Sequence, residues 1–155
     1  MNTNFSIKEF LLGRPKSTFG QLIKYGFFGG IGAAAFFLGT FALQWIFPAY
    51  VDHTVLPPEV VAKNTNLFNT ISFIPSSVIA YLTNRFFVFS PGRHNVWVEA
   101  AIFALISALS YIGGSIGNTW IIETFRTTSA IGTFSFAICS ALVNFVCRKF
   151  IVFKT

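Results

Sequence analysis

Two short runs of polar and cationic residues, each set among aromatic side chains, are the groups in this sequence that could do chemistry. Residues 84–89 read Asn-Arg-Phe-Phe-Val-Phe, and residues 148–153 read Arg-Lys-Phe-Ile-Val-Phe. Each run ends a long hydrophobic stretch and places a polar or cationic pair four residues before its final Phe. Amide, guanidinium and ammonium groups in such a position can bind an anion such as a phosphate.

Arg85 is the residue in these runs that most needs a partner. On a helix it lies about 6 Å deeper than Phe89, with Tyr81 one turn further in on the same face. Burying an unpaired guanidinium in a membrane is costly, so an anionic lipid headgroup is a suitable partner for Arg85 and the neighbouring Asn84.

The second run gives a similar cluster. Asn144 and Arg148 are spaced i, i+4 and share a helix face with Lys149 beside them, so a phosphate could meet an amide, a guanidinium fork and an ammonium. Lys24 stands at the start of the first hydrophobic stretch. The alternative for all these groups is that they snorkel to the membrane interface and only mark topology.

The elements that must position these residues are predicted to be transmembrane helices. Only 10% of the 155 residues are charged and 54% are hydrophobic, whereas a soluble domain has about a quarter charged residues. A span needs about 20 mostly apolar residues, and the continuous apolar runs do not alternate as outer-membrane strands do. We therefore expect an all-α membrane protein, a single domain, with four spans at about 25–47, 67–89, 96–120 and 129–153.

The basic residues fix the expected orientation. Nine of them fall on one side of the predicted spans and two, Lys63 and Arg126, on the other, together with Asp52, Glu59 and Glu123. By the positive-inside rule both termini are cytoplasmic, residues 1–20 form a cytoplasmic segment, and 48–66 form an exposed extracytoplasmic loop. Since topology accounts for the charge, we expect no nucleic-acid partner.

The two predicted hairpins share an orientation, which makes them parallel repeats. Aligning Phe89 with Phe153 gives an offset of 64 residues and places Arg85 on Lys149. Each half also carries a GxxxG spacing in its first span, at 26–30 and 113–117. We interpret these glycines as sites of close helix packing, with a movable thin wall as the alternative.

The sequence resembles the GtrA-like family of small four-span bacterial membrane proteins linked to cell-surface polysaccharide synthesis, over nearly its whole length. Family members open with a basic-aromatic pair followed by a glycine, here Lys24-Tyr25 and then Gly29-Gly30. Their second span ends close to N-F-x-x-N-R-x-x-V-F. Residues 84, 85, 88 and 89 keep this pattern, whereas Ala80 and Tyr81 depart from its start. In the fourth span, residues 144–153 are similar to the family's C-terminal ending.

This resemblance implies translocation of a polyprenyl-phosphate-linked sugar across the bacterial cytoplasmic membrane, in cooperation with a polyprenyl-phosphate glycosyltransferase. Asn84, Arg85, Arg148 and Lys149 would then capture the lipid phosphate, with Asn144 and Lys24 in support. Ala80, where the family has Asn, argues against a second, symmetry-related site.

Other functions remain as alternatives. The sequence has no paired acidic residues for glycosyl transfer, no His or Cys cluster for a metal and no ATP-binding loop, so we expect neither catalysis nor a cofactor. A proton-coupled exporter of the small multidrug type needs a carboxylate at mid-depth, but Glu99 and Glu123 lie near the ends of the third span. A non-transporting anchor for the glycosyltransferase would explain the same charges. Since four helices barely enclose a headgroup, we expect a homodimer or a complex with the partner.

Overall fold

The computed structural model describes residues 18–87 and 95–151, with side chains placed within 23–24, 26–87 and 95–147. This part of the chain forms four long helices and one short 3₁₀ helix, so the predicted all-α fold class is confirmed. The elements in order are α2 (Thr18–Ile46), η1 (Pro48–Tyr50), α3 (Pro58–Phe87), α4 (Val96–Phe125) and α5 (Ser129–Ile151).

Three of these helices contain segments long and apolar enough to cross a membrane: Gly26–Ile46, Val96–Phe125 and Ser129–Cys147. The chain is therefore a membrane protein with transmembrane helices. α3 is more polar than the other three and is not among them, although its 30 residues would extend about 45 Å. The crossing of the membrane by α3 stays a prediction.

The start of α3 corrects the expected loop. We predicted a loop through Asn66, but the helix begins at Pro58, whose fixed φ angle suits a first helical position. Val61 and Ala62 are buried and pack against Ile122 of α4. The prediction is wrong because the segment 58–66, although rich in polar residues, contains apolar side chains that pack against α4.

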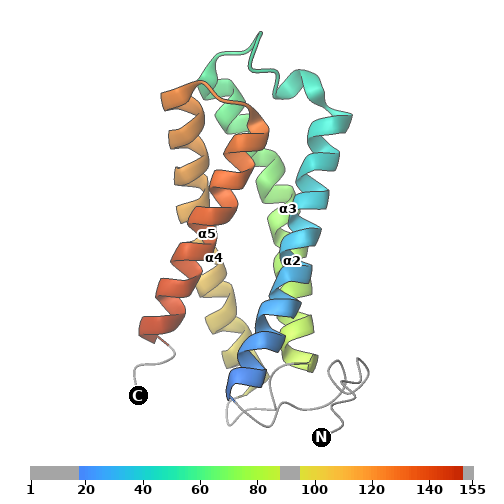
Figure 1. Ribbon diagram of the computed structural model, residues 1–155, viewed down its shortest axis with the longest axis vertical. Coiled ribbons are helices and arrows are strands. Elements are labelled where there is room, and N and C mark those ends of the chain that lie inside the picture. Colours follow the sequence, from blue (N-terminus) through green and yellow to red (C-terminus); the bar gives the residue numbers. More distant parts are fainter. Residues whose placement is uncertain (1–17, 88–94, 152–155) are drawn as a thin grey trace, which may run out of the picture.

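The helices form two antiparallel hairpins, α2 with α3 and α4 with α5, which meet along α3 and α4. We call the end where α2 and α4 begin and α3 and α5 end the terminal end, and the opposite end the loop end (Figure 1). Arg85 and Lys24 therefore lie toward the same end of the bundle. That this end faces the cytoplasm, and that the hairpins are repeats, stay predictions.

Four aromatic rings, one from each long helix, meet in the middle of the bundle. Phe136 is fully buried, and its ring centroid lies 5.3 Å from that of Phe36, 5.8 Å from Phe73 and 5.7 Å from Tyr111. Because lipid offers no hydrophobic drive for helix association, such close ring contacts are a main source of helix pairing. We call these four rings the aromatic layer.

Between the aromatic layer and the loop end, side-chain hydrogen bonds connect three helices. Ser129 Oγ donates to Gln44 Oε1 at 3.1 Å, Gln44 Nε2 donates to Thr133 Oγ1 at 2.9 Å, and Thr133 Oγ1 donates to Asn69 Oδ1 at 3.2 Å. Interhelical bonds of this kind hold membrane helices in register. The polar character of α3 is thus partly turned toward its neighbours.

Glycine packing follows the prediction in one hairpin only. A Cβ added at Gly113 would lie 2.6 Å from Val143 Cγ2, so α4 and α5 approach closely there. Added at Gly26 or Gly30, a Cβ would meet nothing within 4 Å, so the predicted packing of this pair against another helix of the described chain is wrong. On α2 the close approach is made instead by Gly32, 2.8 Å from Ala80 Cβ by the same construction.

Candidate functional site

A groove of about 470 Å³ runs between α3 and α4 on the outside of the bundle. Its lining comes from residues 70–81 of α3 and 100–111 of α4 at spacings of three and four, so one face of each helix forms one wall. Each of these two stretches extends about 16 Å along its helix axis. The lining is mostly apolar, which suits a hydrocarbon chain better than a polar ligand.

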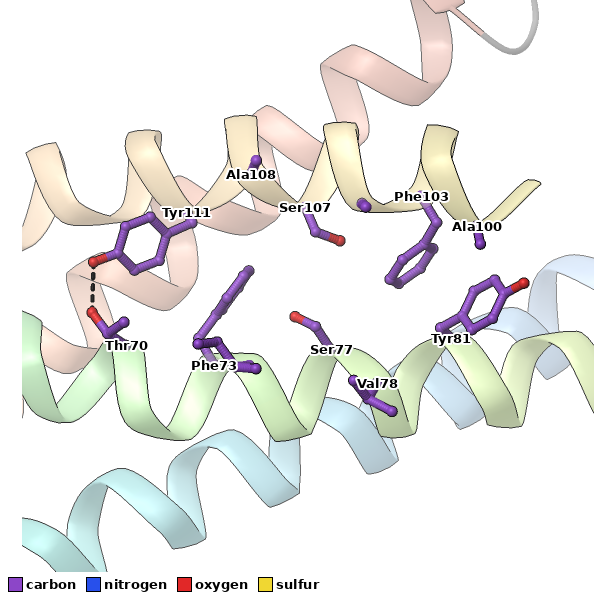
Figure 2. A pocket seen from close by; sticks show the side chains of 12 residues that line it. Thr70, Phe73, Ser77, Val78, Tyr81, Ala100, Phe103, Ser107, Ala108 and Tyr111 are labelled. Atoms are coloured by element: carbon purple, nitrogen blue, oxygen red, sulfur yellow. Dashed lines mark hydrogen bonds between the residues drawn. The ribbon is translucent and has the colours of Figure 1, made fainter. Parts of the chain in front are cut away.

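The two ends of the groove are polar. At the end nearer the loops, the hydroxyl oxygens of Thr70 and Tyr111 lie 2.6 Å apart and close the groove (Figure 2). At the terminal end the ring of Tyr81 packs on Phe103 with centroids 5.2 Å apart. The Tyr81 hydroxyl accepts a hydrogen bond from Arg85 Nη1 at 2.8 Å.

The Arg85–Tyr81 contact places a guanidinium at one end of an apolar groove. The i, i+4 spacing predicted this shared face, and the hydrogen bond between the two side chains agrees with it. Arg85 is half-buried, so its charge is only partly screened by water. Because the tyrosine hydroxyl is uncharged, it orients the guanidinium without neutralising it.

Lys24 occupies a different environment from Arg85. Its side chain is only 3% exposed, and Nζ donates to the carbonyl oxygen of Phe87, in the last turn of α3, over 3.4 Å. Beside it the rings of Phe28 and Phe87 stack with centroids 4.8 Å apart. A cation near a helix C-terminus is favourable, so Lys24 joins α2 to α3, and snorkelling into water does not describe it.

Asn84 and Asn144 line a second hollow, a partly open cavity of about 230 Å³ bounded by all four long helices. Asn84 is 5% exposed and its Nδ2 donates to Ala80 O at 2.8 Å. Its Oδ1 has no hydrogen-bond partner within the described chain. An amide oxygen buried in this way is costly unless a ligand or a water donates to it.

Four of the predicted site residues are therefore divided between two adjacent hollows, and Lys24 lines neither of them. Tyr81 and Arg85 lie at the groove, whereas Asn84 and Asn144 lie at the cavity. The side chains of Arg148 and Lys149 fall outside the described residues.

Sequence reasoning missed the serines that line the cavity. They are Ser76, Ser77, Ser107, Ser110 and Ser140. Their signal was available as small polar residues three or four positions apart on the predicted spans, but such residues also serve as helix-packing contacts. Among the described residues, no three His, Cys, Asp or Glu side chains gather as metal ligands would.

Comparison with known proteins places the chain in a family. The family model described as GtrA/DPMS, transmembrane domain, matches residues 24–153, which include every candidate residue named above. No curated protein matches the chain, and no solved structure matches it.

Proposed function

The chain belongs to the GtrA/DPMS transmembrane domain family, and from this we propose that it moves a polyprenyl-phosphate-linked sugar across the bacterial cytoplasmic membrane. The family match confirms the GtrA-like resemblance found in the sequence. It also makes the chain a membrane protein of glycosyl-lipid metabolism. The direction proposed is from the cytoplasmic to the outer leaflet.

One observation carries the proposal: the apolar groove between α3 and α4 has the Arg85–Tyr81 pair at its terminal end. A polyprenyl phosphate is a long hydrocarbon that ends in an anion, and the groove offers these two environments in the same order. The isoprenoid chain would lie along α3 and α4, with the phosphate against the guanidinium. An Arg–phosphate contact is short, charge-assisted and potentially bidentate.

The partly buried position of Arg85 supports binding of an anion. A guanidinium held at membrane depth is favoured when a counter-charge is supplied, and a lipid phosphate supplies it without leaving the bilayer. Arg148 and Lys149 would add positive charge to the same end of the bundle, as the sequence predicts. Lys24 supports the site indirectly, since it fixes the last turn of α3 that carries Arg85.

The exporter alternative fits the described residues less well. Glu99 lies in the first turn of α4, while Glu123 lies near the end of the same helix. A proton-coupled carrier needs its carboxylate near the middle of the membrane. Both residues are far from that position.

The anchor alternative differs from transport in what it requires of the groove. A protein that only recruits a glycosyltransferase needs its cations on the outer surface but needs no lipid-sized hollow beside them. The groove and the cavity favour transport. A glycosyltransferase partner and a homodimer remain part of the proposal, with the sugar-transfer chemistry performed by the partner.

The test is transport of a fluorescent polyprenyl-phosphate glucose in liposomes that contain only this protein. We expect the lipid to become accessible to a membrane-impermeant reagent on the opposite leaflet. The variant Arg85→Ala with Arg148→Ala should abolish this, while Lys63→Ala, an exposed cation on the same helix, should not.

A second measurement separates transport from anchoring. In membranes that contain the glycosyltransferase, the double variant should still recruit that enzyme. Loss of recruitment by the double variant, or an absence of transport by the unmodified protein, would overturn the proposal in favour of the anchor.

A further inference from the structure

The cavity is lined by several small polar side chains. Five serines and two asparagines, Asn84 and Asn144, contribute to its lining. The Ser76 hydroxyl donates to Phe73 O at 2.9 Å and the Ser110 hydroxyl donates to Ile106 O at 2.8 Å, so each of these two oxygens keeps its acceptor lone pairs. Such a lining complements a ligand that carries several donors, as the hydroxyl groups of a sugar do.

The described lining of the cavity is also uncharged. Among the described residues that line it, none is acidic or basic, and three aromatic rings, Phe36, Phe73 and Phe136, bound it toward the loop end. Its described hydrogen-bonding side chains are therefore neutral, and they can pair with sugar hydroxyl groups without a counter-charge.

The cavity and the groove share one wall. Phe73, Ser77, Phe103 and Ser107 line both hollows, and Figure 2 shows the hydroxyls of Ser77 and Ser107 pointing into the space between α3 and α4. Ser77 and Ser107 are small, so a group bound in the groove can reach the cavity by passing between α3 and α4 at these two serines.

The positions of Asn84 and Arg85 match the covalent order of a glycolipid. They are consecutive residues, so their Cα atoms are about 3.8 Å apart, yet Asn84 lines the cavity and Arg85 contacts Tyr81 at the groove. In a polyprenyl-phosphate sugar the phosphate is bonded directly to the sugar. A ligand with its phosphate at Arg85 thus has its sugar beside Asn84.

We infer that this cavity is the binding site for the sugar of the carried lipid. The inference rests on the proposed function and assigns a separate place to each part of the lipid. The tail occupies the groove, the phosphate contacts Arg85, and the sugar enters the cavity through the shared wall. The cavity volume of about 230 Å³ suits a small headgroup.

Two neighbouring glycines provide a matched test. Gly29 lines the cavity, whereas Gly30 is exposed on another face of α2, and a Cβ added at either meets nothing within 4 Å. The variant Gly29→Leu should therefore add an apolar side chain within the cavity, starting from a Cβ that meets nothing, and Gly30→Leu should add the same side chain outside it. Asn84→Leu is a second cavity variant, which replaces an amide of the lining by an apolar side chain.

The measurement is the affinity of the purified protein for polyprenyl phosphate and for polyprenyl-phosphate glucose. Loss of two or three hydrogen bonds corresponds to about tenfold or more in affinity, so we expect the glucose-bearing lipid to bind about tenfold tighter. Gly29→Leu should abolish this difference while retaining affinity for polyprenyl phosphate, Asn84→Leu should reduce the difference, and Gly30→Leu should keep it.

The outcomes separate this inference from the proposed function. If the unmodified protein binds both lipids equally, or if both cavity variants keep the preference for the glucose lipid, the sugar lies elsewhere and only the inference fails. If the unmodified protein binds neither lipid, the proposed function fails, and the inference fails with it.

Discussion

Removing the Tyr81 hydroxyl tests whether this residue orients Arg85 for a phosphate. The 2.8 Å hydrogen bond from Arg85 Nη1 fixes one edge of the guanidinium. Hydrogen bonds to charged groups contribute about 1.5–3 kcal/mol, so Arg85→Ala should weaken binding of polyprenyl phosphate roughly 10- to 150-fold. Tyr81→Phe leaves the charge in place and loses only the orientation, which corresponds to about 0.5–1.5 kcal/mol, or up to about tenfold.

The two substitutions should be strongly coupled. Because Tyr81 acts through Arg85, adding Tyr81→Phe to Arg85→Ala should weaken binding no further, so the losses from the single variants should not add. Arg85→Lys, which keeps the charge but loses the planar fork, should fall between the unmodified protein and Arg85→Ala.

Affinity for polyprenyl phosphate in nanodiscs measures all four variants, with Lys63→Ala as a control whose affinity should not change. The affinity should also fall as salt rises in the unmodified protein, and much less in Arg85→Ala. Additive losses in the double variant, or an Arg85→Ala protein that binds as tightly as the unmodified one, would refute the assignment of the phosphate to this pair.

Two further predictions concern packing and the loop. Phe136→Ala should lower the free energy of unfolding in detergent by about 2–4 kcal/mol, and because lipid is as apolar as the lost ring, this cost is one of packing. Phe145→Ala, on the exposed face of the same helix, should change the free energy of unfolding by less than about 0.5 kcal/mol. Equal losses in the two variants would contradict the aromatic layer. The pKa of Asp52 is lowered from its usual range by the hydrogen bond from the Thr54 hydroxyl and then by that from the Thr54 backbone N–H. At pH values above the pKa of an unfolded aspartate, the lowered pKa stabilises the folded loop, and this contribution is lost as pH falls through the lowered value. Thr54→Val should raise the pKa of Asp52 in a carboxyl NMR titration. An unchanged pKa would show that Thr54 is not the cause.

Local spacing predicted the parts of the site that lie on one helix. Tyr81 and Arg85 share a face because they are four residues apart, and the structure has them in contact. Spacing does not say which face of a helix meets its neighbours, which is why the pair Gly26 and Gly30 was assigned wrongly while Gly32 was overlooked. That choice depends on the rotation of α2 against α3, which involves residues far apart in the sequence.

The polar residues of α3 were misjudged for a related reason. Asn66 was predicted in a loop, yet its Nδ2 donates to Thr119 Oγ1 of α4 at 2.9 Å. A polar side chain in a membrane helix can be satisfied by another helix, and a count of polar residues alone cannot distinguish this from a loop. The cavity could not be predicted from spacing either, because four helices contribute to its lining and their relative rotation is not given by local sequence.

Photolabelling tests most directly the central claim that the groove between α3 and α4 holds the lipid. A polyprenyl-phosphate glucose with a photoreactive group in its tail would be bound to the unmodified protein, illuminated, and its attachment sites mapped by mass spectrometry of peptides. We predict labels at groove residues such as Ile74, Val78 and Ala104, reduced by excess unlabelled lipid and by Arg85→Ala. Labels that are spread evenly over exposed residues outside the groove, such as Leu38 and Ile116, and that unlabelled lipid does not displace, would contradict the account.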